Sequence, residues 1–220
     1  MIPDLVIFDC DGVLVDSETI SCRIDAAALT AEGYPIDAEE MARRFAGVPS
    51  ADVYRRVGEE RGAPLPADFE DRVDRQILAA YPAQLKAIGP VGEVARGLGL
   101  PMCVASSSRP AKLLLALIVT DLVEIFYPHI FSASLVAHGK PAPDIFLYAA
   151  AAMGVTPERT VVVEDSVAGV TAGVAAGMTV IGFAGASHCG PHHADRLTAA
   201  GARITIASHA DLAGAIDRLP

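Results

Sequence analysis

One stretch near the N-terminus limits the possible folds of this 220-residue chain more than any other. The four apolar residues at positions 5–8 run directly into Asp9 and Asp11, and Gly12 follows. A short apolar run rich in branched and aromatic side chains is typical of a strand that is buried on both faces, as in a parallel sheet. Because ligands bind beyond the carboxyl ends of such strands, we expect the two aspartates at a ligand-binding edge. Aspartate is also common at helix N-caps and turns, so the pair alone does not establish a site.

Later apolar segments alternate with helical patterns and predict one parallel sheet. Such alternation is typical of α/β proteins with a doubly wound sheet, so we expect a Rossmann-like α/β core. Gly169, Gly173 and Gly177 are expected to mark close packing of a helix on this sheet. The further strands are expected at residues 102–105, 130–132, 161–163, 180–183 and 204–206, and the helices between them at 111–119, 144–153 and 167–176.

Residues 18–83 differ from the rest because they contain helical patterns and no buried-strand pattern. Within them, Asp37 and Glu40 have the spacing of a capping box, and Ser50 can cap the next helix. We predict an all-helical cap domain at residues 16–83, inserted into a core domain formed by residues 1–15 and 84–220.

The composition argues against several classes of function. The net charge is −10, from 27 acidic and 17 basic residues, and no basic run of the kind that binds nucleic acid or a membrane surface is present. No apolar run approaches the roughly 20 residues of a membrane-spanning helix. The 4 cysteines are scattered, as is typical of free thiols in a reducing compartment. We expect a cytoplasmic protein with a small-molecule partner; the oligomeric state is not predicted.

Four groups of polar residues follow strand ends or lie in loops, and together they contain the parts that phosphoryl transfer needs. Two aspartates can supply a nucleophile and a proton shuttle. Hydroxyl groups and an arginine at a helix start can bind phosphate, and a lysine followed by prolines is a fixed cation. Two further carboxylates complete an oxygen site for Mg²⁺. The groups are Asp9 and Asp11; Ser106, Ser107, Ser108 and Arg109; Lys140; and Glu164 and Asp165.

These motifs resemble those of the haloacid dehalogenase-like hydrolase superfamily. The sequence at residues 9–18 is similar to its first motif, and Ser106, Lys140 and the pair Glu164 and Asp165 are similar to the second, third and fourth. All are present in order, and they span essentially the whole chain. The resemblance is to the branch, subfamily I, in which a helical cap follows the first strand.

The resemblance implies a role for each motif residue. Asp9 would attack phosphorus and form an aspartyl-phosphate. Asp11 would protonate the leaving oxygen and then deprotonate the attacking water, while Ser106 and Lys140 would hold the phosphoryl group. Mg²⁺ is the implied cofactor, and its implied ligands are Asp9, the backbone carbonyl of Asp11, Glu164 and Asp165.

Further substrate contacts are expected beside the second motif and in the cap. Ser107, Ser108 and Arg109 are candidates for binding phosphate, although the two serines could equally cap the next helix. In the cap, Arg44 and Gly47 are candidates for binding the substrate, and a solvated helix face is an equally good interpretation of the arginine.

The sequence favours one reaction and leaves two alternatives open. Residues 101–104 and 165–169 resemble bacterial 6-phosphogluconate phosphatases. We therefore expect a Mg²⁺-dependent phosphatase acting on a small phosphorylated metabolite, either a sugar phosphate or a phosphorylated sugar acid. The alternatives are a β-phosphoglucomutase-like phosphomutase and a catalytically idle binding protein. The similar mutases carry cap cations where this chain has Ser21 and Ser50, and dehalogenases lack the second aspartate, which is present here as Asp11.

A segment near the C-terminus contains His188, Cys189, His192 and His193. Histidine and cysteine ligate zinc, but this spacing fits no strong zinc pattern, and the prolines and glycines predict a loop. The sequence alone therefore favours a plain loop over a transition-metal site and leaves its role open.

Overall fold

The computed structural model describes residues 2–45, 48 and 50–219. Contacts between residues divide the chain into two compact units. The core unit consists of Met1–Asp16 and Lys86–Pro220, and the helical unit consists of Ser17–Leu85.

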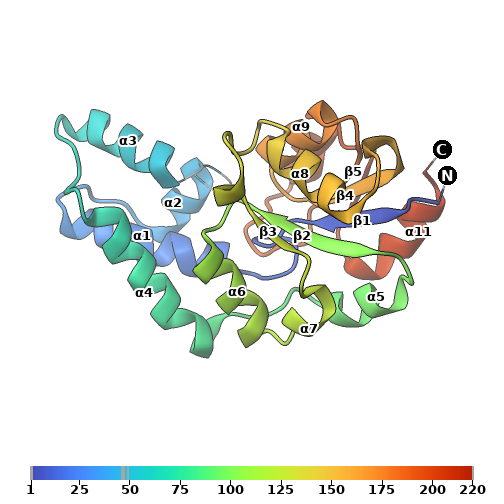
Figure 1. Ribbon diagram of the computed structural model, residues 1–220. Helices are drawn as coiled ribbons and strands as arrows, with labels where there is room; N and C mark the ends of the chain where they lie inside the picture. Colours follow the sequence, from blue (N-terminus) through green and yellow to red (C-terminus); the bar gives the residue numbers. More distant parts are fainter. Residues whose placement is uncertain (1, 46–47, 49, 220) are drawn as a thin grey trace. The chain divides into compact units, whose positions relative to one another are not determined.

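The core unit is built on a sheet of 6 strands, all parallel, in the order β3-β2-β1-β4-β5-β6 (Figure 1). Phe8, the last residue of β1, pairs with Val104 of β2 on one side and with Val163 of β4 on the other. The residues that follow these strands therefore reach the same edge of the sheet. The strands are β1 Leu5–Phe8, β2 Met102–Ser106, β3 Ile130–Ser132, β4 Thr160–Glu164, β5 Thr179–Phe183 and β6 Ile204–Ile206.

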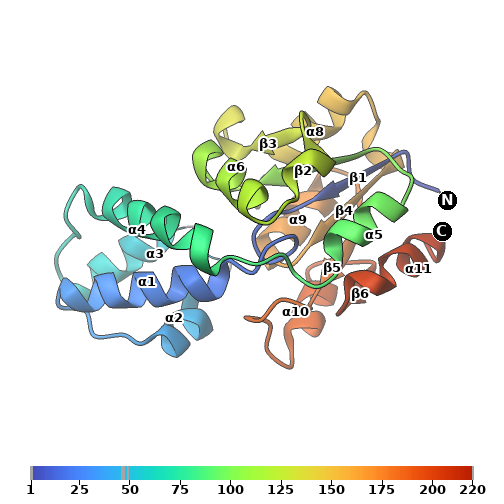
Figure 2. The same ribbon diagram turned by 90° about the horizontal axis from the view of Figure 1, so that it is seen from below.

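Helices cover both faces of this sheet, which confirms the predicted doubly wound α/β fold. One face packs Leu5, Ile7 and Cys103 against side chains of α8 and α9. On the opposite face, Phe8 meets Phe126 of α7 edge-on, with ring centroids 5.7 Å apart, and Figure 2 shows α5 and α11 in front of the sheet. The helices are α5 Val91–Gly97, α6 Pro110–Val119, α7 Val123–Phe126, α8 Asp144–Met153, α9 Val167–Ala175, α10 His193–Ala199 and α11 Leu212–Asp217.

The sequence interpretation located every strand of the core and missed its shorter helices. Helices α5, α7, α10 and α11 were not predicted, because segments of 4 to 7 residues are too short for a clear helical period. Thr156 stands at the cap position of the 3₁₀ turn Pro157–Arg159, which precedes β4.

The helical unit contains the four helices α1 Glu18–Ala31, α2 Ala38–Phe45, α3 Ser50–Arg61 and α4 Phe69–Gln84. The expected cap of α2 is present, since the Glu40 N–H donates a hydrogen bond to Asp37 Oδ1 at 2.7 Å. Tyr54 of α3 packs edge-on against Phe69 of α4, with ring centroids 5.0 Å apart. Its hydroxyl donates to Asp25 Oδ1 of α1 at 2.6 Å, so this unit includes a partly buried polar contact.

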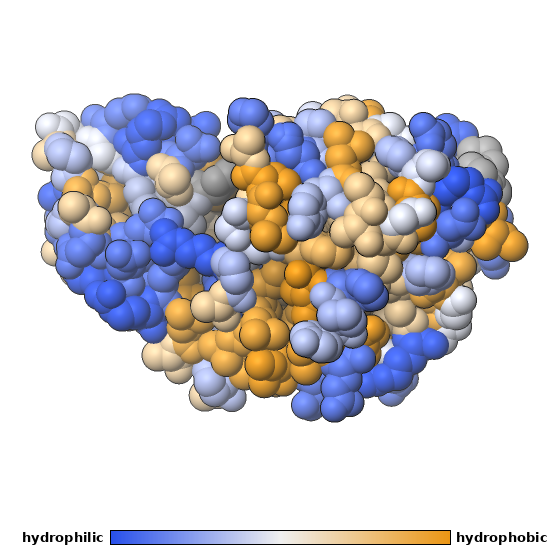
Figure 3. All heavy atoms as spheres, viewed as in Figure 1, coloured by the Kyte–Doolittle hydropathy of each residue, from blue (hydrophilic) through white to orange (hydrophobic). Residues whose placement is uncertain are grey.

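The surface of the core unit carries a few large apolar side chains. Leu114 and Ile118 of α6 are 43% and 49% exposed, and Tyr127, just after α7, is 72% exposed. Hydrophobic colour gathers over the same elements in Figure 3. Within the described ranges, no helix has both the length and the apolar composition of a membrane span.

Candidate active site

Asp9 lies directly after β1 and is held by the ammonium group of Lys140. Lys140 Nζ donates to Asp9 Oδ1 at 2.6 Å, to Glu164 Oε1 at 2.8 Å and to the backbone carbonyl of Ala105 at 3.2 Å. Hydrogen bonds in which the donor or the acceptor is ionised are the strong ones, and these three join the ends of β1, β2 and β4. Asp9 is 7%, Lys140 8% and Glu164 1% exposed, so the network lies out of bulk water.

The charges in this network shift one another's pKa values. Burial raises the pKa of Asp9, and the nearby carboxylates of Glu164, Asp165 and Asp11 raise it further, while Lys140 acts in the opposite direction. Burial alone would lower the pKa of Lys140, but Asp9 and Glu164 outweigh it and raise that pKa, so the ammonium stays charged. The protein alone therefore leaves an excess of negative charge at this strand edge.

Asp11 lies two residues beyond Asp9 and contacts the loop after β2. The Ser108 hydroxyl donates to Asp11 Oδ2 at 2.6 Å, and the Ser108 N–H donates to Ser106 Oγ at 3.0 Å. Ser132 Oγ at the end of β3 donates to the Ser108 carbonyl at 2.7 Å, which fixes this serine from both sides. Ser108 thus contacts Asp11. The residue at the N-cap position of α6 is Arg109, and its side chain makes no capping hydrogen bond.

The other two candidates beside the second motif, Ser107 and Arg109, have exposed side chains just before α6. Ser106 itself is 1% exposed. The structure therefore brings Ser106 and Ser108 to the network of aspartates and places Ser107 and Arg109 at its solvent side.

Glu164, the last residue of β4, is oriented by the start of α9. Both the N–H and the hydroxyl of Ser166 donate to Glu164 Oε2, at 2.7 and 3.0 Å. Ser166 Oγ also accepts a hydrogen bond from the Gly169 N–H at 3.0 Å and so caps α9. A Cβ at Gly169 would lie 1.7 Å from Glu164 Oε1, so this glycine makes room for the carboxylate. At Gly173, as expected, the neighbours are sheet side chains, with Val180 Cγ2 2.6 Å from a built Cβ.

The carboxylates at this edge fit a hard divalent cation. Asp9, Glu164 and Asp165 are all buried, and each can place one oxygen within 4.8 Å of the others. A Cβ at Gly12, where φ is +78°, would lie 2.0 Å from Asp165 Oδ2, so only glycine allows this close approach. Oxygen donors with surplus negative charge are what Mg²⁺ requires. The implied contact of Mg²⁺ with the Asp11 carbonyl stays a prediction.

Comparison with known proteins agrees with this geometry. The family model described as haloacid dehalogenase-like hydrolase matches residues 3–177. The chain belongs to the haloacid dehalogenase-like hydrolase family. A curated relative, 6-phosphogluconate phosphatase from Escherichia coli, is 33% identical over 189 residues, covering 86% of each chain.

Two solved structures are similar to this hydrolase over nearly its whole length. A haloacid dehalogenase-like protein of unknown function from Agrobacterium tumefaciens has 46% identity and a TM-score of 0.87, with 97% of each chain covered. A haloacid dehalogenase family hydrolase from Deinococcus radiodurans, with bound phosphate and sodium, has 36% identity and a TM-score of 0.80. The match covers 98% of this chain and 95% of that chain.

The two candidates in the helical unit differ from the core candidates. The Arg44 guanidinium donates to both carboxylate oxygens of Glu60, at 2.6 and 2.8 Å, and to Tyr34 Oη at 2.7 Å. It also lies 4.6 Å from the ring centroid of Phe45. Gly47 lies outside the described residues. For both, a contact with substrate stays a prediction.

Two histidines of this hydrolase that sequence reasoning did not assign to the site contact Asp165. His188 Nε2 lies 3.1 Å from Asp165 Oδ2, and His193 Nε2 lies 2.5 Å from the Asp165 backbone carbonyl. Burial lowers the pKa of His193, which favours its neutral form. Their closeness in the sequence was the one available signal, and it did not show which residue they face.

Proposed function

We propose that this hydrolase is a Mg²⁺-dependent phosphatase of a small phosphorylated metabolite, a sugar phosphate or a phosphorylated sugar acid. The observation that carries the proposal is the buried carboxylate of Asp9, held by Lys140 beside Glu164 at the end of β1. The Escherichia coli relative bears the name of a sugar-acid phosphatase, and the Deinococcus radiodurans structure contains phosphate, which supports this substrate class.

In the first half of the reaction, a carboxylate oxygen of Asp9 attacks phosphorus and the bond to the ester oxygen breaks. Asp11 gives its proton to that oxygen, so the product leaves as a neutral alcohol. Lys140 keeps Asp9 oriented and offsets negative charge at the reacting group. Mg²⁺ bound by Asp9, Glu164 and Asp165 would supply further positive charge toward the phosphoryl oxygens.

In the second half, water attacks the aspartyl-phosphate and the Asp9–phosphorus bond breaks. Asp11, now ionised, takes a proton from that water, so inorganic phosphate forms and both aspartates return to their first state. The hydrogen bond from the Ser108 hydroxyl to Asp11 Oδ2 fixes one of its oxygens and orients the carboxyl group. Ser106, whose Oγ accepts the Ser108 N–H, has its hydroxyl proton available for a phosphoryl oxygen.

The experiment is a screen of phosphorylated metabolites with Mg²⁺, scored by free phosphate. We expect release from sugar phosphates or phosphorylated sugar acids, and none from the variant Asp9→Asn, whose amide cannot form the acyl-phosphate. Substantial phosphate release by Asp9→Asn would contradict the mechanism.

A second arm tests the phosphomutase alternative. The enzyme is incubated with glucose 1-phosphate, Mg²⁺ and a catalytic amount of the glucose bisphosphate. Ser21 and Ser50 provide no cation to hold a second phosphate, so we expect hydrolysis or no reaction. Steady formation of glucose 6-phosphate without free phosphate would show a mutase instead.

A further inference from the structure

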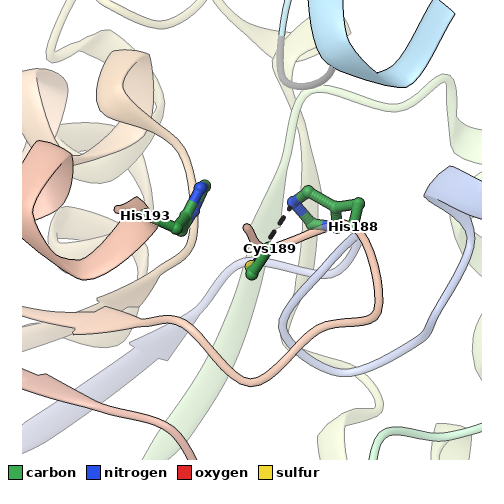
Figure 4. Close-up of side chains that lie close together, drawn as sticks. All are labelled: His188, Cys189 and His193. Carbon is green, nitrogen blue, oxygen red and sulfur yellow. Dashed lines mark hydrogen bonds between the residues drawn. The ribbon is translucent and has the colours of Figure 1, made fainter. Parts of the chain in front are cut away.

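A second group of metal-ligating side chains lies between β5 and α10, next to the carboxylates. We call His188, Cys189 and His193 the His–Cys cluster. Each can place one nitrogen or sulfur ligand atom within 4.8 Å of the others. Figure 4 shows His188 and Cys189 joined by a dashed line, with His193 facing them from the start of α10. All three side chains come from a stretch of six residues, so local backbone structure brings them together.

Local hydrogen bonds hold this stretch in place. The Cys189 N–H donates to the Ala186 carbonyl and the His193 N–H donates to the Gly190 carbonyl, each at 3.0 Å, which makes two successive turns. Ser187 Oγ donates to Asp16 Oδ1 at 2.6 Å and ties the stretch to the first motif. Hydrogen bonds within the chain therefore fix the backbone that carries the three side chains.

One distance within the cluster matches that between two ligands of a tetrahedral metal site. His188 Nε2 and Cys189 Sγ are 3.7 Å apart. Zinc bonds of about 2.1 Å to nitrogen and about 2.3 Å to sulfur put two such ligands about 3.6 Å apart at a tetrahedral angle. Asp165 Oδ2 lies 3.1 Å from the same His188 nitrogen and so borders the cluster, but it belongs to the separate group of carboxylates. A water molecule would complete the four ligands.

The contact of His193 with Asp165 is also compatible with ligation. Because the Asp165 carbonyl can only accept, the hydrogen bond to it places the proton on His193 Nε2 and the lone pair of the neutral ring on Nδ1. An ion bound at Nδ1 would leave that hydrogen bond intact. Metal-binding histidines commonly donate their other N–H to a backbone carbonyl in this way.

We propose that the His–Cys cluster is a transition-metal site that binds Zn²⁺, separate from the carboxylate site and coupled to it through Asp165. Two imidazoles and a thiolate select a borderline-soft ion such as Zn²⁺ over Mg²⁺, whereas the carboxylate site offers oxygen alone. The coupling rests on the proposed Mg²⁺ site, but zinc binding at the cluster does not.

The sign of the coupling follows from the contact between His188 and Asp165. An ion bound at His188 Nε2 replaces the contact of that nitrogen with Asp165 Oδ2 and repels a second cation at the neighbouring carboxylate site. Zn²⁺ therefore weakens Mg²⁺ binding, and by linkage Mg²⁺ weakens Zn²⁺ binding by the same factor. Zinc is thus expected to inhibit Mg²⁺-dependent turnover.

The test uses Co²⁺ as a spectroscopic probe on the chelator-treated chain of 220 residues. We expect one equivalent of Co²⁺ to give strong visible bands of tetrahedral cobalt and a near-ultraviolet thiolate-to-cobalt band, both removed by one equivalent of Zn²⁺. Cys189→Ser should lose the thiolate band. Loss of a group that merely orients a ligand lowers affinity roughly 10–100-fold, so we expect His193→Gln to weaken Co²⁺ binding at least as much.

The matched control is His192→Gln, in the same stretch. Its side chain is 88% exposed and does not belong to the cluster, so its spectrum should equal that of the wild type. Absence of tetrahedral bands in the wild type, or an unchanged thiolate band in Cys189→Ser, would overturn the zinc site and show that the histidines serve only to position Asp165.

The coupling is measured by repeating the Co²⁺ titration at rising Mg²⁺. The apparent Kd for Co²⁺ should increase with Mg²⁺ in the wild type and respond less in Glu164→Gln, which removes a charge from the carboxylate site and keeps the three cluster side chains. Bands that are indifferent to Mg²⁺, in a protein whose phosphatase activity requires Mg²⁺, would overturn the coupling. A protein with the bands and no phosphatase activity would refute the proposed function while leaving the zinc site standing.

Discussion

Two networks of charged side chains, one around Lys140 in the core unit and one around Arg44 in the helical unit, have similar contact distances and different surroundings. The Lys140–Asp9 pair is 2.6 Å long, and its side chains are 5% and 10% exposed. The Arg44–Glu60 pair is also 2.6 Å long, but its side chains are 26% and 46% exposed. Distance alone therefore does not indicate the importance of an ion pair; the protein around it does.

The origin of the two networks differs as well. Asp9 follows β1 and Glu164 ends β4, and the register of these two parallel strands brings them together. Lys140 reaches both from the loop before α8. Arg44 and Glu60 lie on the short helices α2 and α3, and their contact depends on how two helices pack. We expect the first network to control both folding and reaction, and the second to contribute little to either.

Substituting the two cations should separate the networks most strongly. Lys140→Met leaves Asp9 and Glu164 facing each other without a cation, and breaking a buried pair in this way costs about 3–5 kcal/mol of the free energy of unfolding. Arg44→Met, the matched control, should have a far smaller effect, because exposed pairs contribute little. Urea denaturation measures both, and equal losses would contradict the comparison.

Two further measurements check whether the loss of stability predicted for Lys140→Met comes from the lost charge. Added Mg²⁺ should recover part of the lost stability, since a cation among the same carboxylates offsets their repulsion. If Lys140→Met fails to fold, Lys140→Arg keeps a charge and should be intermediate in stability. A variant Lys140→Arg no more stable than Lys140→Met would show that shape and not charge is what the site requires.

Acid should lower the stability of the core unit through its histidines and not that of the helical unit, because all 6 histidines lie outside residues 17–85. His209 is 1% exposed and stacks on Phe183 with ring centroids 4.3 Å apart. Burial lowers its pKa from 6.5 to about 4, although contacts with the backbone of Val13 and Ile88 act in the opposite direction.

The pH dependence follows from that direction. Between about pH 6.5 and about pH 4 the unfolded chain binds a proton at His209 that the folded chain does not. The stability contributed by neutral His209 is present above this window and is lost as the pH falls through it, by about 3 kcal/mol in total. Denaturation curves at several pH values give the free energy of unfolding as a function of pH. This free energy should fall less steeply with falling pH in His209→Gln than in the wild type, and identical slopes would contradict the assignment.

Mg²⁺ should stabilise the core unit by slightly less than the free energy attributed to neutral His209. A ligand at about 100 times its Kd adds roughly 2.7 kcal/mol, and each kcal/mol raises the Tm of a chain of this size by about 2–4 °C. Melting curves with Mg²⁺ should therefore lie about 5–10 °C above those with chelator. Asp165→Asn should respond less, and a wild-type melt indifferent to Mg²⁺ at low salt would argue against the carboxylate site.

The sequence was sufficient to predict the site residues whose positions the sheet determines. Asp9, Lys140 and Glu164 converge because each stands at or near the carboxyl end of the sheet, and a parallel sheet brings such ends together. The apolar runs that predicted the strands are buried in the structure, with all four residues of β1 at 0% exposure.

Contacts that depend on side-chain direction could not be predicted. Ser108 was interpreted as a phosphate ligand or a helix cap, and its bond to Asp11 follows from the path of the loop after β2. Gly169 was interpreted as a packing glycine, but it makes room for Glu164. The contacts of His188 and His193 with Asp165 join residues more than twenty positions apart, so no local pattern reveals them.

The central claim is that Asp9 forms a covalent bond to phosphorus, and trapping the intermediate tests it most directly. The enzyme is mixed with its best phosphate ester and Mg²⁺, quenched in acid during turnover and treated with borohydride, which reduces an acyl-phosphate to an alcohol. Mass spectrometry of the peptide that contains Asp9 then identifies the modified residue. We predict that the side chain at position 9 is converted to the alcohol only when substrate is present. An unmodified Asp9 during active phosphate release, or modification at another carboxylate, would contradict the account.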